Sequence, residues 1–498
     1  MTDKILELEF SSILHNVEKS GGILALSSED FWTGGRIAET VARNAAILNA
    51  KGIAPGDRVL ILHGNTPAFF ADLLATWSIG ACAICLNPQL TQREVQNIEA
   101  FIKPTIALNV EGQTNSKELK VPVTVLANEL EHHYSGVDNP IDLDGEALIL
   151  FTSGTTDIPK GVVHSFRSLM ARFALNAQFI EKDDMAVTMS PLPTHFGHGL
   201  IGNGLTPLLS GAKLILFPAN DVFASAKLGG VIDNHQVTFM SSVPTFWRVV
   251  TNLGKPPVQQ SLRRIHIGSA PLSATLWKKV IEWTGISEVI NMYGITETAN
   301  WLGGASASHF APEDGLVGGL WGGEVRIKTE TNEIRTTGSG EILIKTPSLM
   351  VGYEKQPDLT DKIIQEGWFH TGDIGTVDSQ GVIRITGRLK LEINRAGTKI
   401  YPEEIEILLD SHPMIQETCV FGIPDSVAGE LVGVAVSLVG TATIDVNDIR
   451  QWCLQRITRE KVPEHWHVLQ DLPKNDRGKV DRIAITSTCI NKIRIGAS

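Results

Sequence analysis

Short apolar runs alternate with longer segments of mixed polarity along the first part of the chain. The runs 58–62 and 81–86 have the length and composition of buried strands, whereas 40–51 and 69–78 have the polarity pattern of helices. Strands that are apolar throughout are typical of parallel sheets covered by helices on both faces. This part of the chain therefore predicts an α/β sheet subdomain.

A second set of apolar runs repeats this pattern further along the chain. It comprises 148–151, 213–217, 237–244 and 264–272, and it predicts a second α/β sheet subdomain. From about 315 to 387 the pattern changes to strand-like pieces separated by glycine turns, with little helical periodicity. We expect a small β-rich subdomain there.

After Gly387 the pattern changes again, to a charged stretch followed by mixed helix and strand signals. Helices and strands are expected at 402–413, 417–424, 431–439 and 446–459. They predict a compact α+β module, and the polar stretch before it suits a short hinge. The expected fold class is α/β, with two sheet subdomains and the β-rich subdomain in an N-terminal domain (1–387), followed by a mobile α+β C-terminal domain (388–498).

Composition and charge exclude several classes of protein. The 498 residues carry a net charge of −12, which disfavours binding to the phosphate backbone of nucleic acids. The first segment, MTDKILELEF, has charges where a secretory signal needs an apolar core, and no apolar run reaches the roughly 18 residues that span a bilayer. Five scattered cysteines do not form a disulfide framework. We expect a cytoplasmic protein without a membrane span.

Two residue pairs have a spacing that metal sites also use. Cys82 and Cys85 form a CxxC inside an apolar stretch, without the second pair that a zinc site requires, so a buried strand is expected. His195 and His198 are also three residues apart, but the sequence offers no third ligand. Neither pair predicts a zinc site.

Residues 150–164, LFTSGTTDIPKGVVH, combine an apolar strand with a loop rich in glycine and hydroxyl groups. Gly154 allows the backbone to approach phosphate oxygens, and Lys160 adds a cation. The loop is not a Walker A motif, because Pro159 and Gly161 flank the lysine. An ordinary surface turn is the alternative. As an ATP-binding loop it would use Thr152, Ser153, Gly154, Thr155, Thr156 and Lys160.

Further segments follow in an order that carries a family resemblance. They are LNPQLTQREV at 86–95, PLPTHFGHGL, GSAPLS, NMYGITET, HTGD, ITGRLKLEINRAGTKIYPEEIE and PKNDRGKVDR. Together with the loop above, they resemble the adenylate-forming superfamily, which includes acyl-CoA synthetases, firefly luciferases and nonribosomal peptide adenylation domains. The match runs through nearly the whole chain, and it is most similar to a stand-alone AMP-forming acyl-CoA synthetase.

The resemblance implies a nucleotide site built from several of these motifs. Tyr293 would lie against the adenine ring, with Asn291 near the exocyclic amine. Thr296 and Glu297 would meet the α-phosphate and Mg²⁺, with Glu297 as the metal ligand. The remaining ATP or AMP contacts fall, by the same resemblance, on Ser269, Ala270, Pro271, Met292, Gly294 and Ile385 and, at the ribose hydroxyls, on Asp373 and Arg388.

The resemblance also implies a reaction in two halves. A carboxylate attacks the α-phosphate of ATP to give acyl-AMP and pyrophosphate, and a thiol then attacks the activated carbonyl and releases AMP. Lys479 would be the catalytic lysine of the first half. Lys390 would be the hinge about which the C-terminal domain turns between the halves. That turn would bring Arg395, Ala396 and Gly397 to coenzyme A.

The acyl pocket implied by the resemblance includes Trp301, which is bulky where many relatives carry smaller residues. A long straight channel is therefore disfavoured and a short or ring-shaped acid is predicted, unless Trp301 packs in the core away from the substrate. The register of PTHFGHGL leaves open whether His195 or His198 is the family histidine. We predict that His195 is catalytic. Either His195 or Phe196 would gate the carboxylate of the substrate. The rest of the pocket comprises His198, Gly199, Gly268 and Thr298.

One residue of the phosphate loop departs from the family pattern. Asp157 replaces the third glycine, and its carboxylate would repel a triphosphate unless it points outward. Two rivals to a CoA ligase stay open: an adenylating enzyme that loads a carrier protein or an amine, and a catalytically silent nucleotide-binding relative. We favour a small carboxylic acid, ATP with Mg²⁺, and coenzyme A as the ligands. Nucleic acid is excluded as a partner, and a homodimer is left open.

Overall fold

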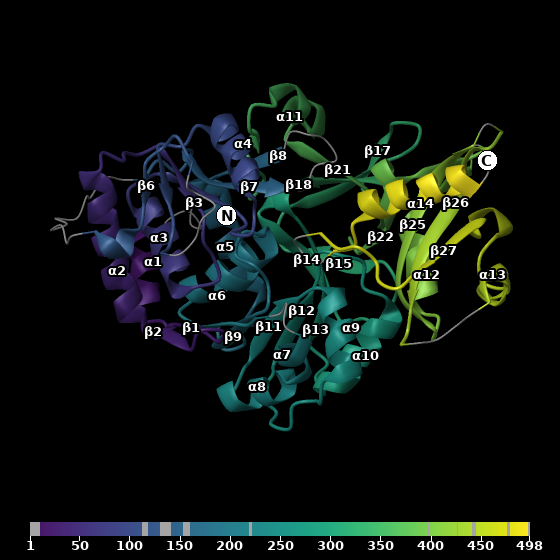
Figure 1. Ribbon diagram of the computed structural model, residues 1–498, viewed down its shortest axis with the longest axis horizontal. Helices are drawn as coiled ribbons and strands as arrows, with labels where there is room; N and C mark the ends of the chain where they lie inside the picture. The colour runs from purple at the N-terminus through teal and green to yellow at the C-terminus, as the bar shows by residue number, and fades with distance from the viewer. Residues whose placement is uncertain are drawn as a thin grey trace.

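The computed structural model describes residues 10–111, 118–129, 141–152, 160–218, 222–396, 398–425, 427–440, 445–475 and 479–496. It has a large N-terminal domain and a smaller C-terminal domain, which lies at one end of the long axis and is coloured yellow-green to yellow in Figure 1. In these ranges no helix has the length and apolar character needed to cross a membrane. The expected α/β fold class with an added α+β domain is confirmed.

Helices surround the sheets of both domains (Figure 1). The α-helices are α1 (Phe10–Glu18), α2 (Gly34–Ala50), α3 (Pro67–Ser78), α4 (Gln92–Ile102), α5 (Phe166–Phe179), α6 (Thr206–Leu209), α7 (Val222–Ala226), α8 (Leu228–His235), α9 (Pro244–Leu253), α10 (Ala274–Thr284), α11 (Pro357–Ile363), α12 (Pro402–Asp410), α13 (Val446–Leu454) and α14 (Arg482–Gly496). Short 3₁₀ turns are η1 (Leu126–Asn128), η3 (Thr296–Thr298), η4 (Leu389–Leu391) and η5 (Arg459–Lys461), and η2 (His198–Leu205) is a π-helix.

The first sheet is formed by strands from the N-terminal part of the chain and by two later strands at one edge. In sheet order they are β19 (Gly352–Tyr353), β8 (Lys160–Ser165), β7 (Glu146–Thr152), β4 (Cys82–Cys85), β3 (Arg58–Ile61), β5 (Ile106–Leu108) and β6 (Val123–Thr124). The pairs from β7 to β6 are parallel, whereas β8 and β19 are antiparallel to their neighbours.

Alternate residues of β3 pack on opposite faces of this sheet. Val59 and Ile61 belong to the core shared with α2, α3 and α5, whereas Leu60 packs with Val95 and Ile98 of α4. A strand that is covered on both faces must be apolar at every position, which explains the continuous apolar runs. The two cysteines of the CxxC lie buried in β4, as a strand interpretation predicts.

The second α/β subdomain and the β-rich subdomain share one continuous sheet. Its order is β17 (Ile334–Arg335), β16 (Glu324–Lys328), β18 (Gly338–Lys345), β21 (Trp368–Val377), β22 (Ile383–Arg388), β15 (Leu316–Leu320), β14 (Asn300–Ser306), β13 (Val289–Ile295), β12 (Arg264–Ile267), β11 (Phe239–Ser242), β9 (Val187–Ser190), β10 (Lys213–Leu216), β1 (Ile23–Ala25) and β2 (Asp30–Trp32), with β20 (Ile364–Gln365) beside β21. Strand direction changes at β13, since β12 is parallel to it and β14 antiparallel. The hydrogen-bonded ladder therefore continues across the boundary between the predicted subdomains.

The C-terminal domain is an α+β module. Its sheet has the order β24 (Thr398–Ile400), β23 (Ile393–Arg395), β26 (Gly429–Leu438) and β25 (Ile415–Asp425), with β27 (His465–Leu469) beside β26. Ile405 and Leu409 of α12 and Ile449 of α13 pack with Val434 and Val436 of β26. This core is separate from those of the N-terminal domain.

Two elements differ from the pattern-based expectation. The expected helix 402–413 ends at Asp410, because Pro413 disfavours helical backbone at the residue before it. The β-rich region contains a short helix, α11, whose first residue is Pro357. Proline at the first helical position is favourable, but a seven-residue segment is too short to give a helical period.

Candidate active site

The end of β13 and the strands β21 and β22 carry a polar cluster. The Tyr293 hydroxyl donates to Asp373 Oδ2 at 2.7 Å, and Arg388 Nε lies 2.9 Å from Asp373 Oδ1. Asp373 and Arg388 are paired in the register of β21 and β22, so the sheet itself brings them together. The Asp373 charge raises the pKa of Arg388. The residues expected at adenine and ribose therefore lie in one place.

Glu297 lies in η3, directly after β13, and it is held by a tyrosine from another sheet. The Tyr353 hydroxyl donates to Glu297 Oε1 at 2.6 Å. Burial, and next the Glu297 charge, raise the pKa of Tyr353, so this hydroxyl keeps its proton. The Tyr353 ring also lies 5.2 Å from Lys160 Nζ, measured to the ring centroid. Tyr353 therefore touches both the expected magnesium ligand and the expected phosphate lysine.

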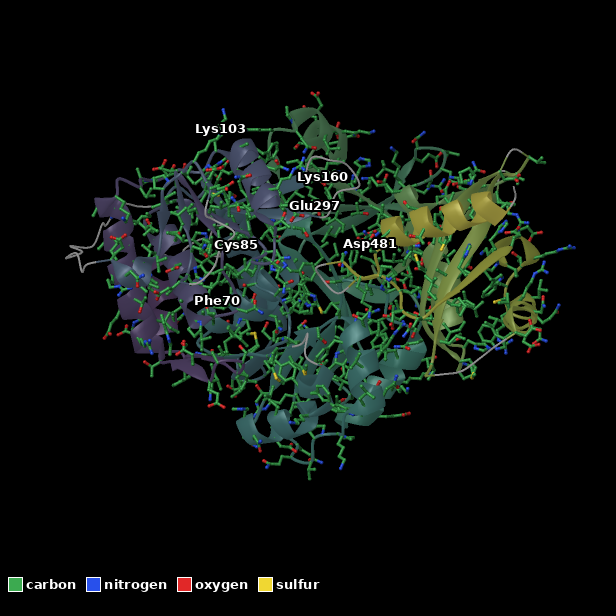
Figure 2. All side chains as sticks on the ribbon, viewed as in Figure 1. Phe70, Cys85, Lys103, Lys160, Glu297 and Asp481 are labelled. Carbon is green, nitrogen blue, oxygen red and sulfur yellow. The ribbon has the colours of Figure 1, made fainter. Side chains whose placement is uncertain are left out.

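Positive charge gathers beside Glu297. The pKa of Lys160 is lowered, first by burial and next by the nearby ammonium group of Lys390, while the Glu297 charge opposes the shift. Figure 2 shows Lys160 and Glu297 in the same part of the N-terminal domain. Two ammonium groups beside a carboxylate suit a polyphosphate that carries a hard cation.

The donor set beside Glu297 fits Mg²⁺ as a partner of ATP. Within the described ranges, no cluster of three or more His, Cys, Asp or Glu side chains could hold a metal ion. Mg²⁺ commonly takes one or two protein carboxylates and completes its shell with phosphate oxygens and water. Glu297 would supply such a carboxylate, and the Tyr353 hydroxyl holds it in place through Oε1.

Part of the expected phosphate loop lies outside the described residues. This applies to Ser153, Gly154, Thr155, Thr156 and Asp157 and, in the C-terminal domain, to Gly397. Thr152 ends β7, where its backbone pairs with Lys160 of β8. The predictions for these loop residues, including the effect of Asp157, stay predictions.

Lys479 is delivered to this site by the C-terminal domain. Its Nζ lies 5.4 Å from the centroid of the Phe196 ring. Asn475 braces the turn around it, since the Lys479 N–H donates to Asn475 Oδ1 at 3.1 Å and the Asn475 N–H donates to the Lys479 carbonyl at 2.8 Å. Asp481, two residues further on, lies near the boundary between the domains in Figure 2. The expected catalytic lysine and the PTHFGHGL motif therefore meet.

His198, at the start of η2, is enclosed and uncharged. Its Nδ1 lies 2.8 Å from Ser269 Oγ and its Nε2 lies 2.5 Å from Ser241 Oγ. Burial, and next the Lys479 charge, lower its pKa to about 3. The ring is therefore neutral at pH 7 and has both nitrogens in hydrogen bonds. His195 is half-buried in the turn before η2.

Trp301 is buried and also borders His198. Only 1% of its surface is exposed, and its ring lies edge-on to His198 with 6.0 Å between centroids. Phe239, His266 and Trp321 surround it with centroid distances of 4.6–6.5 Å. The two interpretations of Trp301, core packing and closure of the acyl side, are therefore compatible.

Two buried arginines lie behind this aromatic cluster, and protein groups engage both. Arg264 Nε donates to His266 Nε2 at 2.9 Å, and two carboxylates lie within 3.8 Å of its Nη1. Arg172 donates to Ser348 Oγ at 2.6 Å and to the Trp321 carbonyl at 3.4 Å. Burial lowers the pKa of Arg172 to about 9. Both guanidinium groups therefore hydrogen-bond to residues that pack around Trp301.

The other expected contacts lie around these two clusters. Asn291 Nδ2 donates to the Leu316 carbonyl at 2.7 Å, which leaves its Oδ1 as an acceptor for an amine. A β-carbon on Gly199 would lie 2.3 Å from the Pro193 carbonyl, so only glycine fits there. The remaining residues lie after β12 (Gly268, Ser269, Ala270, Pro271), on β13 (Met292, Gly294), in η3 (Thr296, Thr298) and on β22 (Ile385).

The residues expected at coenzyme A are engaged inside the C-terminal domain. Arg395 forms an ion pair with Glu464 and donates to the Glu460 carbonyl. Ala396 has a left-handed backbone with φ of 49°. In this arrangement Arg395 contacts its own domain, while Lys479 contacts Phe196 of the N-terminal domain.

Sequence reasoning missed Tyr353, Ser241, His266 and Trp321. Tyr353 sits in LMVGYEK and the others sit in apolar strands or glycine turns, so none stands in a segment with recognisable chemistry. Their positions follow from the pairing of β8 with β19 and from neighbouring strands of the second sheet. Only a Gly-Tyr pair between strand-like pieces could have drawn attention to Tyr353.

Comparisons with known proteins identify the family of the chain. The family model described as AMP-binding enzyme matches residues 13–354, and the AMP-binding enzyme C-terminal domain matches residues 404–479. A probable CoA ligase from Humulus lupulus is 30% identical and covers 92% of both chains. An oxalate–CoA ligase from Arabidopsis thaliana is 29% identical and covers 97% of this chain and 99% of its own. Among solved structures, ATP-bound MatB from Rhodopseudomonas palustris has a TM-score of 0.86 at 25% identity, over 97% of this chain and 100% of that chain.

Proposed function

Because the chain belongs to the AMP-binding enzyme family, we propose that it is an AMP-forming acid–thiol ligase. Such an enzyme converts a carboxylic acid to its CoA thioester. One observation carries the proposal: Lys479 of the C-terminal domain lies against Phe196, beside the neutral His198. The CoA ligases among its relatives support the same chemistry. The family resemblance of the sequence is confirmed.

In the first half-reaction the acid carboxylate attacks the α-phosphorus of ATP, and pyrophosphate leaves. Asp373 and Arg388 would hold the ribose hydroxyls, and Lys160 would hold the outer phosphates. Mg²⁺ would supply charge neutralisation at the phosphates, with Glu297 as its protein ligand. Lys479 would place its ammonium group between the carboxylate and the α-phosphate. That charge is most valuable where negative charge develops in the transition state.

In the second half-reaction the thiol of coenzyme A attacks the acyl carbonyl and AMP leaves. We propose domains of residues 1–387 and 388–498, with Lys390 in η4 as the hinge between them. A turn about Lys390 would withdraw Lys479 and bring in the loop around Gly397. Arg395 would then exchange its contacts with Glu464 for a contact with coenzyme A.

The acid is short or ring-shaped and has an uncharged tail. Trp301 closes the space beside His198, which limits length. The neutral His198 and the hydroxyls of Ser241 and Ser269 form a wall that is polar but carries no charge. A second carboxylate would lose its hydration against this wall, which is unfavourable because protein groups already engage Arg172 and Arg264, and Lys479 is assigned to the reacting carboxylate.

We place the enzyme in a reducing compartment, and the cytoplasm is the proposed site. All five cysteines lie within the described residues as buried side chains outside disulfides. Cysteines that form no disulfide are typical of compartments that keep thiols reduced.

Pyrophosphate release tests the proposal. The protein is incubated with ATP and Mg²⁺ and with short, branched, aromatic and long acids, with and without coenzyme A, beside a Lys479→Ala variant. We expect release that depends on the acid and is lost in the variant, and thioester only when coenzyme A is present. Binding of ATP without release for any acid would contradict the proposal and would support a silent relative.

A further inference from the structure

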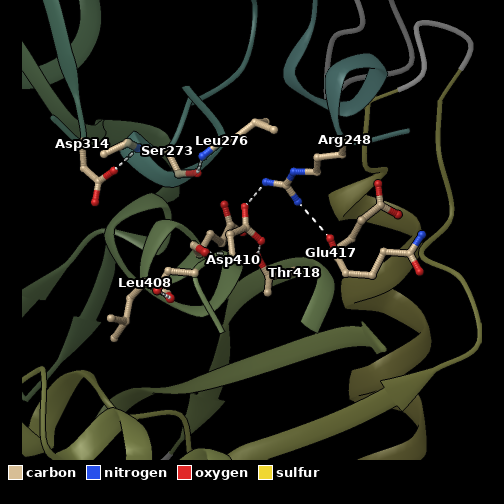
Figure 3. A network of polar contacts seen from close by, with 12 residues as sticks. Arg248, Ser273, Leu276, Asp314, Leu408, Asp410, Glu417 and Thr418 are labelled. Atoms are coloured by element: carbon tan, nitrogen blue, oxygen red, sulfur yellow. Dashed lines mark hydrogen bonds and ion pairs between the residues drawn. The ribbon is translucent and has the colours of Figure 1, made fainter. Parts of the chain in front are cut away.

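One arginine joins α9 of the N-terminal domain to the C-terminal domain. Figure 3 shows Arg248 reaching across to Asp410 at the end of α12. Its Nη2 forms an ion pair with Asp410, and its Nη1 donates to the Gln416 carbonyl at 3.0 Å. Asp410 Oδ1 also accepts from the Thr418 hydroxyl at 2.9 Å. Arg248 therefore holds the end of α12 and the start of β25 at once.

This ion pair is enclosed by the contact between the domains. The side chains of Arg248 and Asp410 are 21% and 13% exposed. Burial raises the pKa of Asp410, and the Arg248 charge opposes that shift. Without the guanidinium, Asp410 would be a buried carboxylate without its cation, and separation of the domains would return it to water. The docked arrangement therefore depends on Arg248.

The same helix holds the segment that carries Lys479. Glu406 lies one turn before Asp410 on α12, and its Oε2 accepts from Arg482 Nη2 at 3.0 Å. Arg482 follows Lys479 by three residues and starts α14. Because α12 is a rigid helix, its anchor to α9 and its anchor to the Lys479 segment are mechanically coupled.

A second ion pair across the same domain boundary offers a contrast. Lys399 Nζ lies 3.2 Å from Glu330 Oε1, but these side chains are 45% and 78% exposed. Exposed pairs of this kind contribute little, because water and salt screen them. Loss of Glu330 should therefore leave the docking unchanged, which makes it a matched control.

We propose that Arg248 is a positioning residue for adenylation: it docks the C-terminal domain through Asp410 and so keeps Lys479 at Phe196. The inference rests on the proposed role of Lys479 in the first half-reaction. It assigns Arg248 no contact with substrate. Its loss should therefore lower the adenylation rate while ATP affinity and the second half-reaction are preserved.

The docking itself is tested by a distance measurement that requires no turnover. Spin labels are placed on the exposed positions Glu282→Cys of α10 and Arg450→Cys of α13, since the native cysteines are buried. Double electron–electron resonance should give one dominant distance in the otherwise unchanged protein and in Glu330→Gln. Arg248→Ala should broaden or shift that distribution. An Arg248→Ala distribution equal to that of the unchanged protein would overturn the proposal.

The role in catalysis is tested by separating the half-reactions, with the best acid from the panel above. Arg248→Ala should lower pyrophosphate release on the order of 10-fold to 100-fold, with an unchanged KM for ATP. Thioester formation from isolated acyl-adenylate and coenzyme A should be unaffected. Arg248→Lys should recover part of the loss, and the exchanged pair Arg248→Asp with Asp410→Arg should recover more than either single variant.

The outcomes separate this inference from the function on which it rests. If Lys479→Ala leaves pyrophosphate release intact, the proposed role of Lys479 is wrong, and the distance measurement still reports on docking. If Lys479→Ala abolishes release but Arg248→Ala slows both half-reactions equally, Arg248 is a general stability residue and the inference is wrong.

Discussion

The part of the site expected to bind the nucleotide (the nucleotide side) and the part expected to bind the acyl group (the acyl side) hold their polar side chains with different kinds of partner. On the nucleotide side, ionised groups are held by one another or by a hydroxyl: Asp373 by Arg388 and Glu297 by Tyr353. On the acyl side, His198 is neutral and is enclosed by two serines and by Trp301. Under the proposed function, the first arrangement suits a polyphosphate and the second suits a group without charge.

Under the proposed function, this difference would let the site distinguish ATP from the acid. Charged ligands gain from ionised partners that are already oriented, since little reorganisation is then needed. An uncharged acyl tail gains instead from burial and shape, and a mismatched charge is rejected by desolvation. A substitution on the nucleotide side should therefore change ATP binding, and a substitution on the acyl side should change the preferred acid.

The largest expected effect comes from opening the acyl side. Trp301→Ala should lower the free energy of unfolding by about 3–5 kcal/mol and should move the preferred acid toward longer chains. Chemical denaturation and pyrophosphate release with butyrate, hexanoate and octanoate measure both effects. Trp283→Ala, at a buried tryptophan of α10 outside this cluster, is the control. If both variants keep the same chain-length preference, Trp301 does not limit the acid.

Removal of the central carboxylate should damage the nucleotide side alone. Asp373→Ala leaves Arg388 and Tyr293 without their shared partner and should weaken ATP binding by about 3 kcal/mol. Isothermal titration calorimetry with ATP measures the loss. Asp378→Ala, which removes an exposed carboxylate 3.6 Å from Arg384, should bind ATP normally. Equal affinity in all three proteins would show that Asp373 does not contact the nucleotide.

The neutral state of the acyl side should appear in the pH dependence of stability. Burial lowers the pKa of His198 to about 3 and, outside the acyl side, burial lowers the pKa of His164, a buried residue of β8, to about 4. Below their ordinary pKa of about 6.5 the unfolded chain binds protons that the native chain does not, so stability is present above that pH and falls as the pH falls. From about pH 7 to pH 5 each histidine should remove roughly 2 kcal/mol.

Urea unfolding between pH 5 and pH 7 tests this expectation. His198→Gln should reduce the slope of stability against pH by about one proton. His15→Gln, at an exposed histidine of α1, should leave the slope unchanged. A slope in His198→Gln that equals the slope of the unchanged protein would mean that His198 is charged in the native state.

The smallest expected effect concerns Tyr353, which links the expected magnesium ligand Glu297 to the expected phosphate lysine Lys160. Tyr353→Phe keeps the ring near Lys160 and removes the hydroxyl from Glu297. We expect a loss of about 1.5 kcal/mol, roughly tenfold, in affinity for ATP with Mg²⁺ and little change for ATP in excess EDTA. Tyr401→Phe, which removes a weaker hydroxyl contact to Glu392 at 3.3 Å, is the control. Equal losses with and without Mg²⁺ would contradict the link.

The two sides also differ in how far the sequence predicts them. Tyr293, Asp373, Arg388 and Lys160 each stand in a contiguous motif, and the structure brings the first three together and places Lys160 beside Glu297. Tyr353 could not be predicted, because it meets Glu297 only through the pairing of β19 with β8.

The fold shows the same limit. Continuous apolar runs predicted β3, β4 and β10 to within a residue or two, because each is covered on both faces. The continuity of the second sheet was not predicted, since it depends on the pairing of β15 with β22, a strand far along the chain. A local sequence pattern shows which strand residues are buried. It does not show which distant strand they pair with, or in which register.

The contrast between the two sides is tested most directly by matched pairs of acids. The rate of pyrophosphate release at limiting acid is measured for butyrate against succinate and for benzoate against phthalate, at pH 7 with saturating ATP and Mg²⁺. We expect the member with an uncharged tail to react faster in each pair. Faster reaction of the dicarboxylates would contradict this expectation and would show that a buried cation, such as Arg172, is available to the substrate.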